Sequence, residues 1–264
     1  PRTESGRYYE LKGRKDALLA NVSRASRKDF RNAVVAARKA WSGWAATTAC
    51  LRGQILYRVA EMLEGRAGQF EEELRAQGAT PVAARKEVTA SVDLFVHYAG
   101  WSDKYQSLFS SVNPVATPHF NFSMPESTGV VAAVAPEGSG LLGLSSVVAP
   151  ILVGGNTSVI LASHARPLCA ITLAEVLNSS DVPGGTVNIL TGLRDELLPQ
   201  FAEHMDVNAL LVCSDESGEI RLAQERAVEN VKRVIPHADA PLAESPYHIL
   251  DLQEIKTTWH PVGV

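Results

Sequence analysis

The stretch Gly129-Val-Val-Ala-Ala-Val-Ala135 opens the part of the sequence that decides the fold. It is a short β-rich run, and four more such runs follow it, separated by segments whose apolar residues have helical spacing. The five runs lie at 129–135, 157–162, 186–190, 208–213 and 231–235, and the helical segments lie at 141–153, 167–177, 195–203 and 217–229. This alternation predicts an α/β fold, a parallel sheet with right-handed crossovers and helices on both faces.

The residues that precede this sheet predict a layer of helices. Apolar residues three and four positions apart indicate helices that begin at Asp29, which we expect to be the cap, near Leu51 and near Phe70. Thr80 followed by Pro81 is typical of the N-cap and first residue of a fourth helix. These residues suggest neither a nucleophile nor a ligand cluster, so we interpret them as a helical layer packed on the sheet.

Two further segments predict a β arm. Residues 112–127 contain three prolines and alternate apolar with polar side chains, as an exposed strand does, and 247–252 and 255–260 resemble strands. We expect 112–125 to pair with 247–262. The chain then divides into an N-terminal segment and helical layer (1–111), the first part of the arm (112–127), a Rossmann-like α/β domain (128–235), and a linker with the closing arm (236–264).

Composition narrows the classes of function. The chain has 264 residues, with 25 Lys and Arg against 29 Asp and Glu, so its formal charge of −4 gives no reason to expect nucleic acid or an anionic membrane as a partner. The apolar segment 141–153 is too short to span a bilayer. Three cysteines cannot build a disulfide framework, which favours a cytoplasmic location. A start at Pro1 is expected of a processed chain or of a piece of a longer polypeptide.

One glycine motif is a candidate nucleotide site. Gly138-Ser-Gly-Leu-Leu-Gly143 is a G-x-G-x-x-G run that follows a predicted strand and opens a helix, where backbone amides can receive a pyrophosphate. The acidic residue that should hold the ribose about 20 positions later is missing, because the next strand ends at Ser163-His164. His164 and Arg166 are a weak substitute that would face a 2′-phosphate. A simple tight turn is the favoured interpretation.

Cysteine and histidine offer little for catalysis or metal binding. Cys213 ends the fourth predicted strand of the sheet, but its acidic neighbours Asp215 and Glu216 would disfavour a reactive thiolate. Cys50 and Cys169 lie in helical apolar patterns. The seven histidines form no pair at metal-ligand spacing, so we predict neither a catalytic residue nor a metal site.

Several motifs resemble the aldehyde dehydrogenase superfamily in the order in which that family carries them. Pro150 with Gly155-Asn-Thr157 resembles the P-x-L-x-x-G-N-T turn, and Val182-Pro-Gly-Gly-Thr-Val-Asn-Ile-Leu-Thr-Gly192 resembles the G-x-P-x-G-x-V-N-x-x-T-G run. Thr128–Val131 is similar to the first sheet strand, and Ile255–Trp259 is similar to the closing strand of the oligomerisation arm. The longer pattern looks most like the truncated second half of family 16 aldehyde dehydrogenases.

The departures from the family pattern point away from catalysis. The family's P-W-N-F-P is Pro136–Gly140 here, so Gly138 stands where an asparagine amide stabilises the oxyanion. On the nearest register Leu161 replaces the lysine that binds the adenosine ribose, and His164 replaces the glutamate. The F-T-G-S turn under the pyrophosphate is Leu211–Ser214, in which only the serine remains. The E-L-G-G-K motif with the general base is missing, as is the catalytic domain with its nucleophilic cysteine.

The resemblance therefore implies a pseudoenzyme. Its cofactor-binding residues would be a vestigial set, namely Pro136, Gly138, Ser163, Gly192 and Ser214. We expect no cofactor, or NAD or NADP if any, and a catalytically inactive module with an assembly or scaffolding role. Its partner would be a second copy or an active aldehyde dehydrogenase chain, with Trp259 in the interface unless the tail folds back on its own domain. The alternatives are a nicotinamide-nucleotide-binding subunit of an aldehyde oxidoreductase and an enzyme whose partner supplies the nucleophile.

Overall fold

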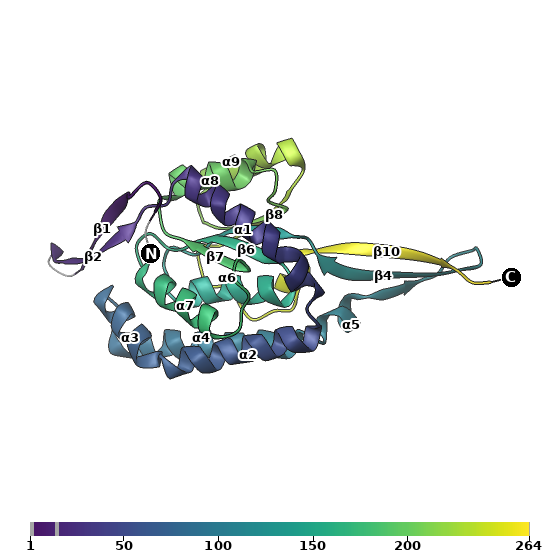
Figure 1. Cartoon of the computed structure of the whole chain (residues 1–264), viewed down its shortest axis with the longest axis horizontal. Coiled ribbons are helices and arrows are strands. Elements are labelled where there is room, and N and C mark those ends of the chain that lie inside the picture. The colour runs from purple at the N-terminus through teal and green to yellow at the C-terminus, as the bar shows by residue number, and fades with distance from the viewer. Residues whose placement is uncertain (1–2, 14–15, 264) are drawn as a thin grey trace.

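The computed structural model describes residues 3–13 and 16–263, and a five-stranded parallel sheet lies at its centre (Figure 1). Its strands are β5 (Val130–Val134), β6 (Thr157–Leu161), β7 (Val187–Leu190), β8 (Ala209–Cys213) and β9 (Arg233–His237). The spatial order is β7-β6-β5-β8-β9. The chain therefore builds outward from β5 in one direction and then returns to build in the other, which places a topological switch point between β5 and β8.

The sheet is parallel and central because its inner strands are apolar at nearly every position. All residues of β5, β6 and β8 are buried, so neither face of these strands can lie against water. In the ladder, Val131 of β5 stands beside Ser158 of β6 and beside Ala209 of β8. The predicted α/β class and the parallel pairing are both confirmed.

Helices cover both faces of the sheet, as expected. On one face α6 (Leu142–Val153) and α7 (Leu168–Ser179) lie on the strands, with α2 (Ala49–Gly65), α3 (Ala67–Ala76) and α4 (Pro81–Trp101) packed outside them. On the other face lie α1 (Arg27–Ala46), α8 (Arg194–Glu203) and α9 (Ser217–Ala227). Each face has its own apolar core, which includes Phe95 and Leu152 on the first side and Phe30 and Phe201 on the second. Among the described residues, no helix combines the length and the apolar character needed to cross a membrane.

The start of the chain contains one unanticipated element and one expectation that needs correction. Residues before the first helix form an antiparallel ribbon of β1 (Tyr8–Lys12) and β2 (Leu18–Ser23), which the sequence pattern did not indicate. The cap of α1 is Ser26 rather than Asp29. Asp29 is the third residue of the helix, and its carboxylate accepts the backbone N–H of Ser26 in a capping box. Thr80 and Pro81 do begin α4 as predicted.

Two expectations near the end of the chain also need correction. The last strand of the sheet begins at Arg233 rather than Val231, because Val231 ends the 3₁₀ turn η2 (Val228–Asn230) in a left-handed conformation with φ of 54°. The expected strand at 247–252 is instead the short helix α10 (Tyr247–Leu250), which follows Pro246 and buries Ile249. Only the second predicted strand exists, as β10 (Gln253–Pro261).

The β arm projects away from the body (Figure 1). It follows the short helix α5 (Tyr105–Phe109) and contains β3 (Ser111–Asn113), β4 (His119–Ser127) and β10, antiparallel in the order β10-β4-β3. Trp259 stands opposite Asn121 in the register and leaves 58% of its surface exposed. The arm therefore presents apolar side chains to its surroundings rather than to its own domain.

Asn156 fastens the root of the arm to the sheet. This side chain is completely buried in the turn after α6. Its Oδ1 accepts the backbone N–H of Gly129 at 2.9 Å, and its Nδ2 donates to the carbonyl of Leu252 at 2.9 Å. One amide thus ties the entry to β5 to the residue before β10. Next to it, Gln253 Nε2 donates to the carbonyl of Gly154 at 3.2 Å.

Candidate functional site

The carboxyl ends of β5 and β8 are where a ligand of a parallel sheet is expected, because the strand order reverses there. The segments that follow the strands carry several charged side chains. Glu137 follows β5, Arg194 begins α8 after β7, Glu219 lies in the first turn of α9 after β8, and Asp239 follows β9. The structure brings these four residues together.

Glu137 occupies the space between the loops after β5 and β6. Its carboxylate accepts the backbone N–H groups of Ala165 at 2.6 Å and His164 at 3.2 Å. Ser163 Oγ donates to the carbonyl of Glu137 at 2.8 Å, and Glu137 N–H donates to Asp239 Oδ1 at 2.6 Å. Backbone amides that would face a bound anion are therefore already satisfied by carboxylates of the chain itself.

Arg194 lies at the centre of this group, with 15% of its side chain exposed. Its guanidinium donates to the carbonyl of Ala135 at 2.7 Å and lies 3.6 Å from Glu137, 3.2 Å from Glu219 and 3.5 Å from Asp239. Three carboxylates and one guanidinium leave a formal charge of −2 at the switch point. A pyrophosphate that entered here would meet net repulsion.

The N-terminus of α6 is also occupied. Glu87 of α4 accepts the backbone N–H groups of Leu141 at 2.9 Å and Leu142 at 3.1 Å, and it accepts Ser139 Oγ at 2.8 Å. These are the groups with which a G-x-G-x-x-G loop would hold a phosphate. Here a carboxylate of the helical layer takes them, in agreement with the interpretation of Gly138–Gly143 as a structural turn.

The five predicted cofactor-binding residues do lie at this edge of the sheet, at the ends of four neighbouring strands. Ser163 and Ser214 both use their hydroxyl groups internally, on Glu137 and Glu219 respectively, the second bond being 2.6 Å long. Pro136 is buried, and Gly192 packs against Leu197. Gly138 is exposed and has open space around it. Whether these residues bind a cofactor remains a prediction.

Leu161 and His164, which replace the family's lysine and glutamate on the nearest register, have different surroundings. Leu161 is completely buried in the apolar core under α1 and α8, so it does not face the sheet edge. The ring of His164 lies against Tyr9 of the N-terminal ribbon, with 4.3 Å between the ring centroids. Burial, together with the charge of Glu137, raises the pKa of Tyr9, and its hydroxyl donates to the carbonyl of His164 at 3.2 Å. The ribbon thus covers the loop after β6.

Two of the three cysteines are buried as small apolar side chains, as expected, whereas the expectation for Cys50 is wrong because that residue is exposed. Cys169 and Cys213 are buried and Cys50 is exposed, and all three are free thiols. Burial raises the pKa of Cys213 to about 12, although the nearby Arg194 acts in the opposite direction. A thiol of that pKa is protonated at neutral pH and is a poor nucleophile.

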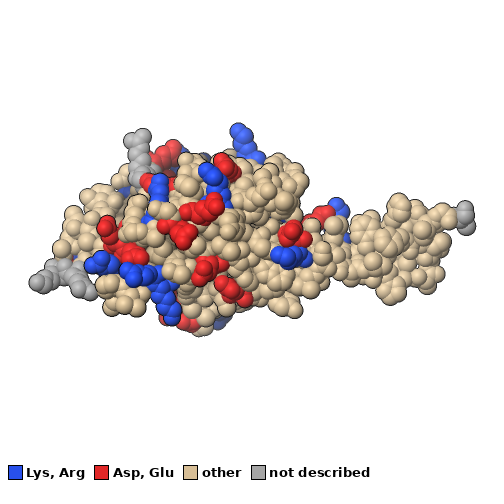
Figure 2. All heavy atoms as spheres, turned by 90° about the horizontal axis from the view of Figure 1, so that it is seen from below, with Lys and Arg blue, Asp and Glu red and all other residues tan. Residues whose placement is uncertain are grey.

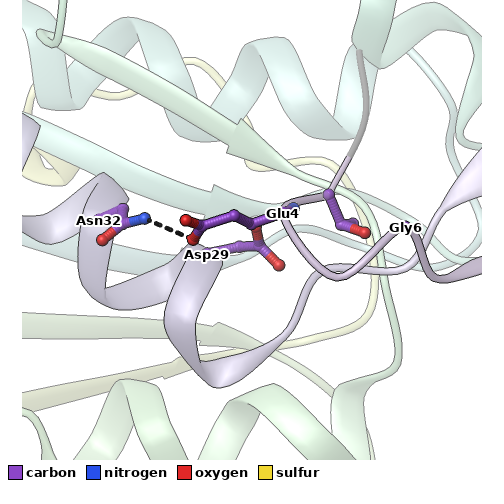
Figure 3. A pocket seen from close by; sticks show the side chains of 5 residues that line it. Glu4, Gly6, Asp29 and Asn32 are labelled. Carbon is purple, nitrogen blue, oxygen red and sulfur yellow. Dashed lines mark hydrogen bonds between the residues drawn. The ribbon is translucent and has the colours of Figure 1, made fainter.

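A hollow of about 530 Å³ lies away from this edge, where the opening residues meet the first turn of α1 (Figure 3). Its acidic groups are satisfied locally, since Asn32 Nδ2 donates to Glu4 at 3.2 Å and Lys28 pairs with Glu4 at 2.8 Å. Partial burial pushes the pKa of Asp29 upward, but hydrogen bonds from Glu4 and Ser26 outweigh it and lower the pKa. We therefore interpret the hollow as a capping structure rather than a ligand site.

Sequence reasoning identified the right edge of the sheet but missed the residues that occupy it. The signal was present for three of them, because Glu137 and Asp239 lie three and two residues beyond strands and Glu219 lies in the first turn of a helix after a strand. Glu87 gave no such signal, since it lies about 50 residues earlier on a regular helix. Only the packing of α4 against α6 brings it to the site.

Comparison with known proteins identifies relatives of one kind. The model of the aldehyde dehydrogenase family matches residues 3–238. Cytosolic 10-formyltetrahydrofolate dehydrogenase of Mus musculus is 32% identical over 225 residues, which cover 83% of this chain and 25% of that protein. An aldehyde dehydrogenase of Alternaria alternata is 28% identical, with 87% of this chain and 48% of that protein covered.

Solved structures agree with this result. PnpE from Pseudomonas sp. WBC-3, also solved in complex with nicotinamide adenine dinucleotide, superposes with a TM-score of 0.86 and 26% identity. The match covers 90% of this chain and 49% of PnpE. The chain thus spans about a quarter to a half of the length of the proteins it matches.

Proposed function

Since this chain belongs to the aldehyde dehydrogenase family, we propose that it is a non-catalytic module of that family with a role in assembly. Two features support the proposal: carboxylates of the chain itself fill the sheet edge where a cofactor would bind, and the β arm is exposed. The module would be joined to, or partnered with, an active aldehyde dehydrogenase or a second copy of itself. A cytoplasmic location is part of this proposal, and three free cysteines support it. We propose neither nucleic acid nor a membrane as a partner.

The observation that carries the proposal is the ionic cluster at the switch point. Arg194 holds Glu137, Glu219 and Asp239 where a pyrophosphate would lie, and Glu87 holds the amides at the start of α6. Displacing these carboxylates would expose a partly buried guanidinium and orphan several backbone N–H groups. Each buried group left unpaired costs about 1–3 kcal/mol, which a nucleotide would have to recover.

The arm supports an assembly role. Residues 111–125 and 257–263 contain no Asp, Glu, Lys or Arg. Figure 2 shows the same contrast, with charged side chains spread over the body and the outer arm free of them on the visible face. Phe120, Ile255 and Trp259 leave 46%, 53% and 58% of their surfaces exposed. An uncharged, partly apolar ribbon with a free strand edge is suited to pairing with another chain.

The alternative of a nicotinamide-nucleotide-binding subunit rests on the solved neighbours that hold this dinucleotide. Titration calorimetry with NAD and with NADP separates the two proposals. For this chain we expect no binding in the low micromolar range, because the net negative cluster and the capped amides oppose a pyrophosphate. A dissociation constant of a few micromolar or tighter, lost in a Ser214→Trp variant, would favour the alternative.

Substitution of Trp259 by alanine is expected to weaken association, and to lower the melting temperature only as far as association itself stabilises the folded chain. Truncation of an aromatic anchor in an interface costs about 2 kcal/mol, or roughly thirtyfold in the dissociation constant. Sedimentation over a range of concentrations measures the change. Tyr57→Ala, which truncates an aromatic side chain of α2 with 52% exposure, is the matched control and should leave association unchanged. If the native chain is monomeric throughout, and Trp259→Ala lowers only the melting temperature, the assembly role is wrong.

A further inference from the structure

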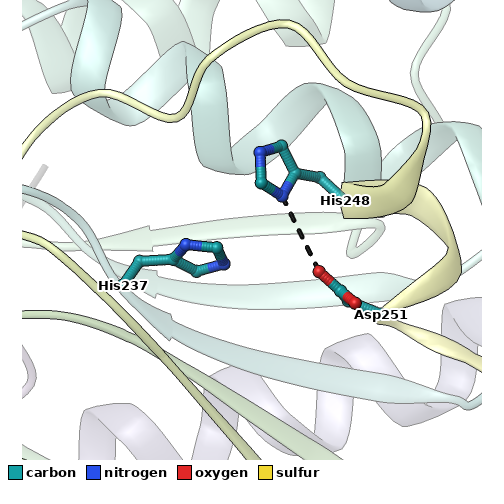
Figure 4. Close-up of side chains that lie close together, drawn as sticks. All are labelled: His237, His248 and Asp251. Atoms are coloured by element: carbon teal, nitrogen blue, oxygen red, sulfur yellow. Dashed lines mark ion pairs between the residues drawn. The ribbon is translucent and has the colours of Figure 1, made fainter.

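Two histidines and an aspartate meet at the carboxyl end of β9 (Figure 4). His237 is the last residue of β9, His248 lies on α10, and Asp251 follows that helix directly. The sequence pattern concealed this group because 247–252 was expected to be a strand. As a helix, the segment places His248 and Asp251 one turn apart, on the same side.

The geometry of the three side chains fits a small metal ion. One ligand atom from each residue lies within 4.8 Å of the other two. His248 Nδ1 is 3.7 Å from Asp251 Oδ2, and the imidazole rings are 5.1 Å apart at 78°. Tetrahedral zinc with bonds near 2.1 Å needs ligand atoms about 3.4 Å apart, so closure by about 1.4 Å at most is required. Rotation of the side chains can supply that movement.

Unpartnered nitrogen atoms supply the second observation. His237 Nε2 and His248 Nδ1 are both buried, and neither has a hydrogen-bond partner among the described residues. Buried polar atoms are nearly always paired, so two imidazole nitrogens without a hydrogen bond, one of them 3.7 Å from the Asp251 carboxylate, point to an occupant that accepts electron pairs. A metal ion meets that requirement.

The surroundings provide both rigidity and access. His237 is fixed by the β8–β9 ladder, in which it stands opposite Cys213, and α10 is anchored by the completely buried Ile249. Asp251 keeps 43% of its side chain exposed, whereas His248 keeps 16%. The group is therefore open on one side, where a water molecule would complete four-coordination.

We propose that His237, His248 and Asp251 form a binding site for a divalent transition metal of the zinc type. Two imidazole nitrogens and one carboxylate oxygen match the ligand preference of zinc and differ from the all-oxygen sets of Mg²⁺ and Ca²⁺. The bound ion would connect the end of β9 to α10, which leads directly into β10. Its role is to fix the root of the arm to the sheet.

Zinc titration of the full chain tests the site. After dialysis against a chelator, the protein is titrated with Zn²⁺ in a calorimeter, and Co²⁺ is used as a spectroscopic probe of coordination. We expect one equivalent to bind with a micromolar or tighter dissociation constant and an intense tetrahedral cobalt spectrum. Saturating zinc should raise the melting temperature by roughly 5 °C or more, because the ion binds only the folded chain.

Variants decide whether these residues are the ligands. His237→Ala, His248→Ala and Asp251→Asn should each weaken zinc binding at least about tenfold, since even outer-shell changes cost 10–100-fold. Asp251→Asn keeps the shape of the side chain and guards against a folding defect. His260→Ala, on the exposed arm, is the matched control and should bind as the native chain does.

Absence of micromolar binding, a weak octahedral cobalt spectrum, or equal binding by all variants would overturn the proposal. Trp259→Ala should bind zinc normally, so this test is independent of assembly.

Discussion

Replacement of Asn156 by alanine is expected to lower the free energy of unfolding by about 4 kcal/mol. The substitution orphans two buried backbone groups, the N–H of Gly129 and the carbonyl of Leu252, at about 1–3 kcal/mol each. It also leaves a small void in a completely buried turn. Gly129 cannot easily move to find another partner, because the next residue, Val130, is held through its backbone N–H by Asn208 Oδ1 at 3.0 Å.

Urea denaturation followed by circular dichroism measures this loss. Asn178→Ala, on an exposed position of α7, is the matched control and should change stability by less than about 0.5 kcal/mol. We also expect faster amide hydrogen exchange at the root of β10 in the Asn156 variant, since Leu252 loses its anchor. A loss below about 1 kcal/mol would show that the turn is held by the packing around it and not by the amide of Asn156.

Replacement of Arg194 by methionine is expected to cost about 2–4 kcal/mol. Methionine fills much of the same space, but it leaves Glu137, Glu219 and Asp239 facing one another and orphans the carbonyl of Ala135. Breaking a buried ion pair costs about 3–5 kcal/mol, and the estimate is reduced because the carboxylates keep 27–31% exposure.

The loss of stability in the Arg194 variant should also depend on salt concentration. Added salt screens the repulsion among partly exposed carboxylates, so the deficit should shrink between low and high ionic strength. Arg221→Met removes an exposed arginine that pairs with Glu225 on α9, and it should leave the free energy of unfolding essentially unchanged. If Arg194→Met and Arg221→Met have the same small effect, the cluster is not what holds the sheet edge together.

The parallel sheet could be predicted because the residues of each strand form a recognisable local sequence pattern. Runs such as Val130–Val134 are apolar along both faces and are bounded by turn residues, so they fit only the middle of a covered sheet. The error at Tyr247–Leu250 has the opposite cause. That segment is too short for a helical period to show, and its single buried side chain, Ile249, depends on tertiary packing.

The sequence predicts where the candidate site lies but not which side chains fill it. Strand ends such as Cys213 locate the edge of the sheet from the sequence alone, whereas the occupant of that edge depends on which distant side chains reach it. Glu87 and Arg194 come from helices whose sequences show only ordinary exposed charges. Their roles arise from the approach of α4 to α6 and of α8 to the strand ends, which no local pattern encodes.

The pairing of β4 with β10 has a consequence for biosynthesis. The facing residues Ser127 and Gln253 are 126 positions apart in the chain (253 minus 127), so β4 leaves the ribosome long before its partner. At about 5–20 residues per second, the wait is roughly 6–25 s, which is long compared with the collapse of the preceding helices. During that interval Phe120 and Phe122 stand on a strand that can pair with β3 but whose edge toward β10 has no partner. The nascent chain therefore passes through a stage in which its arm is open to chaperones, or to the arm of a neighbouring chain.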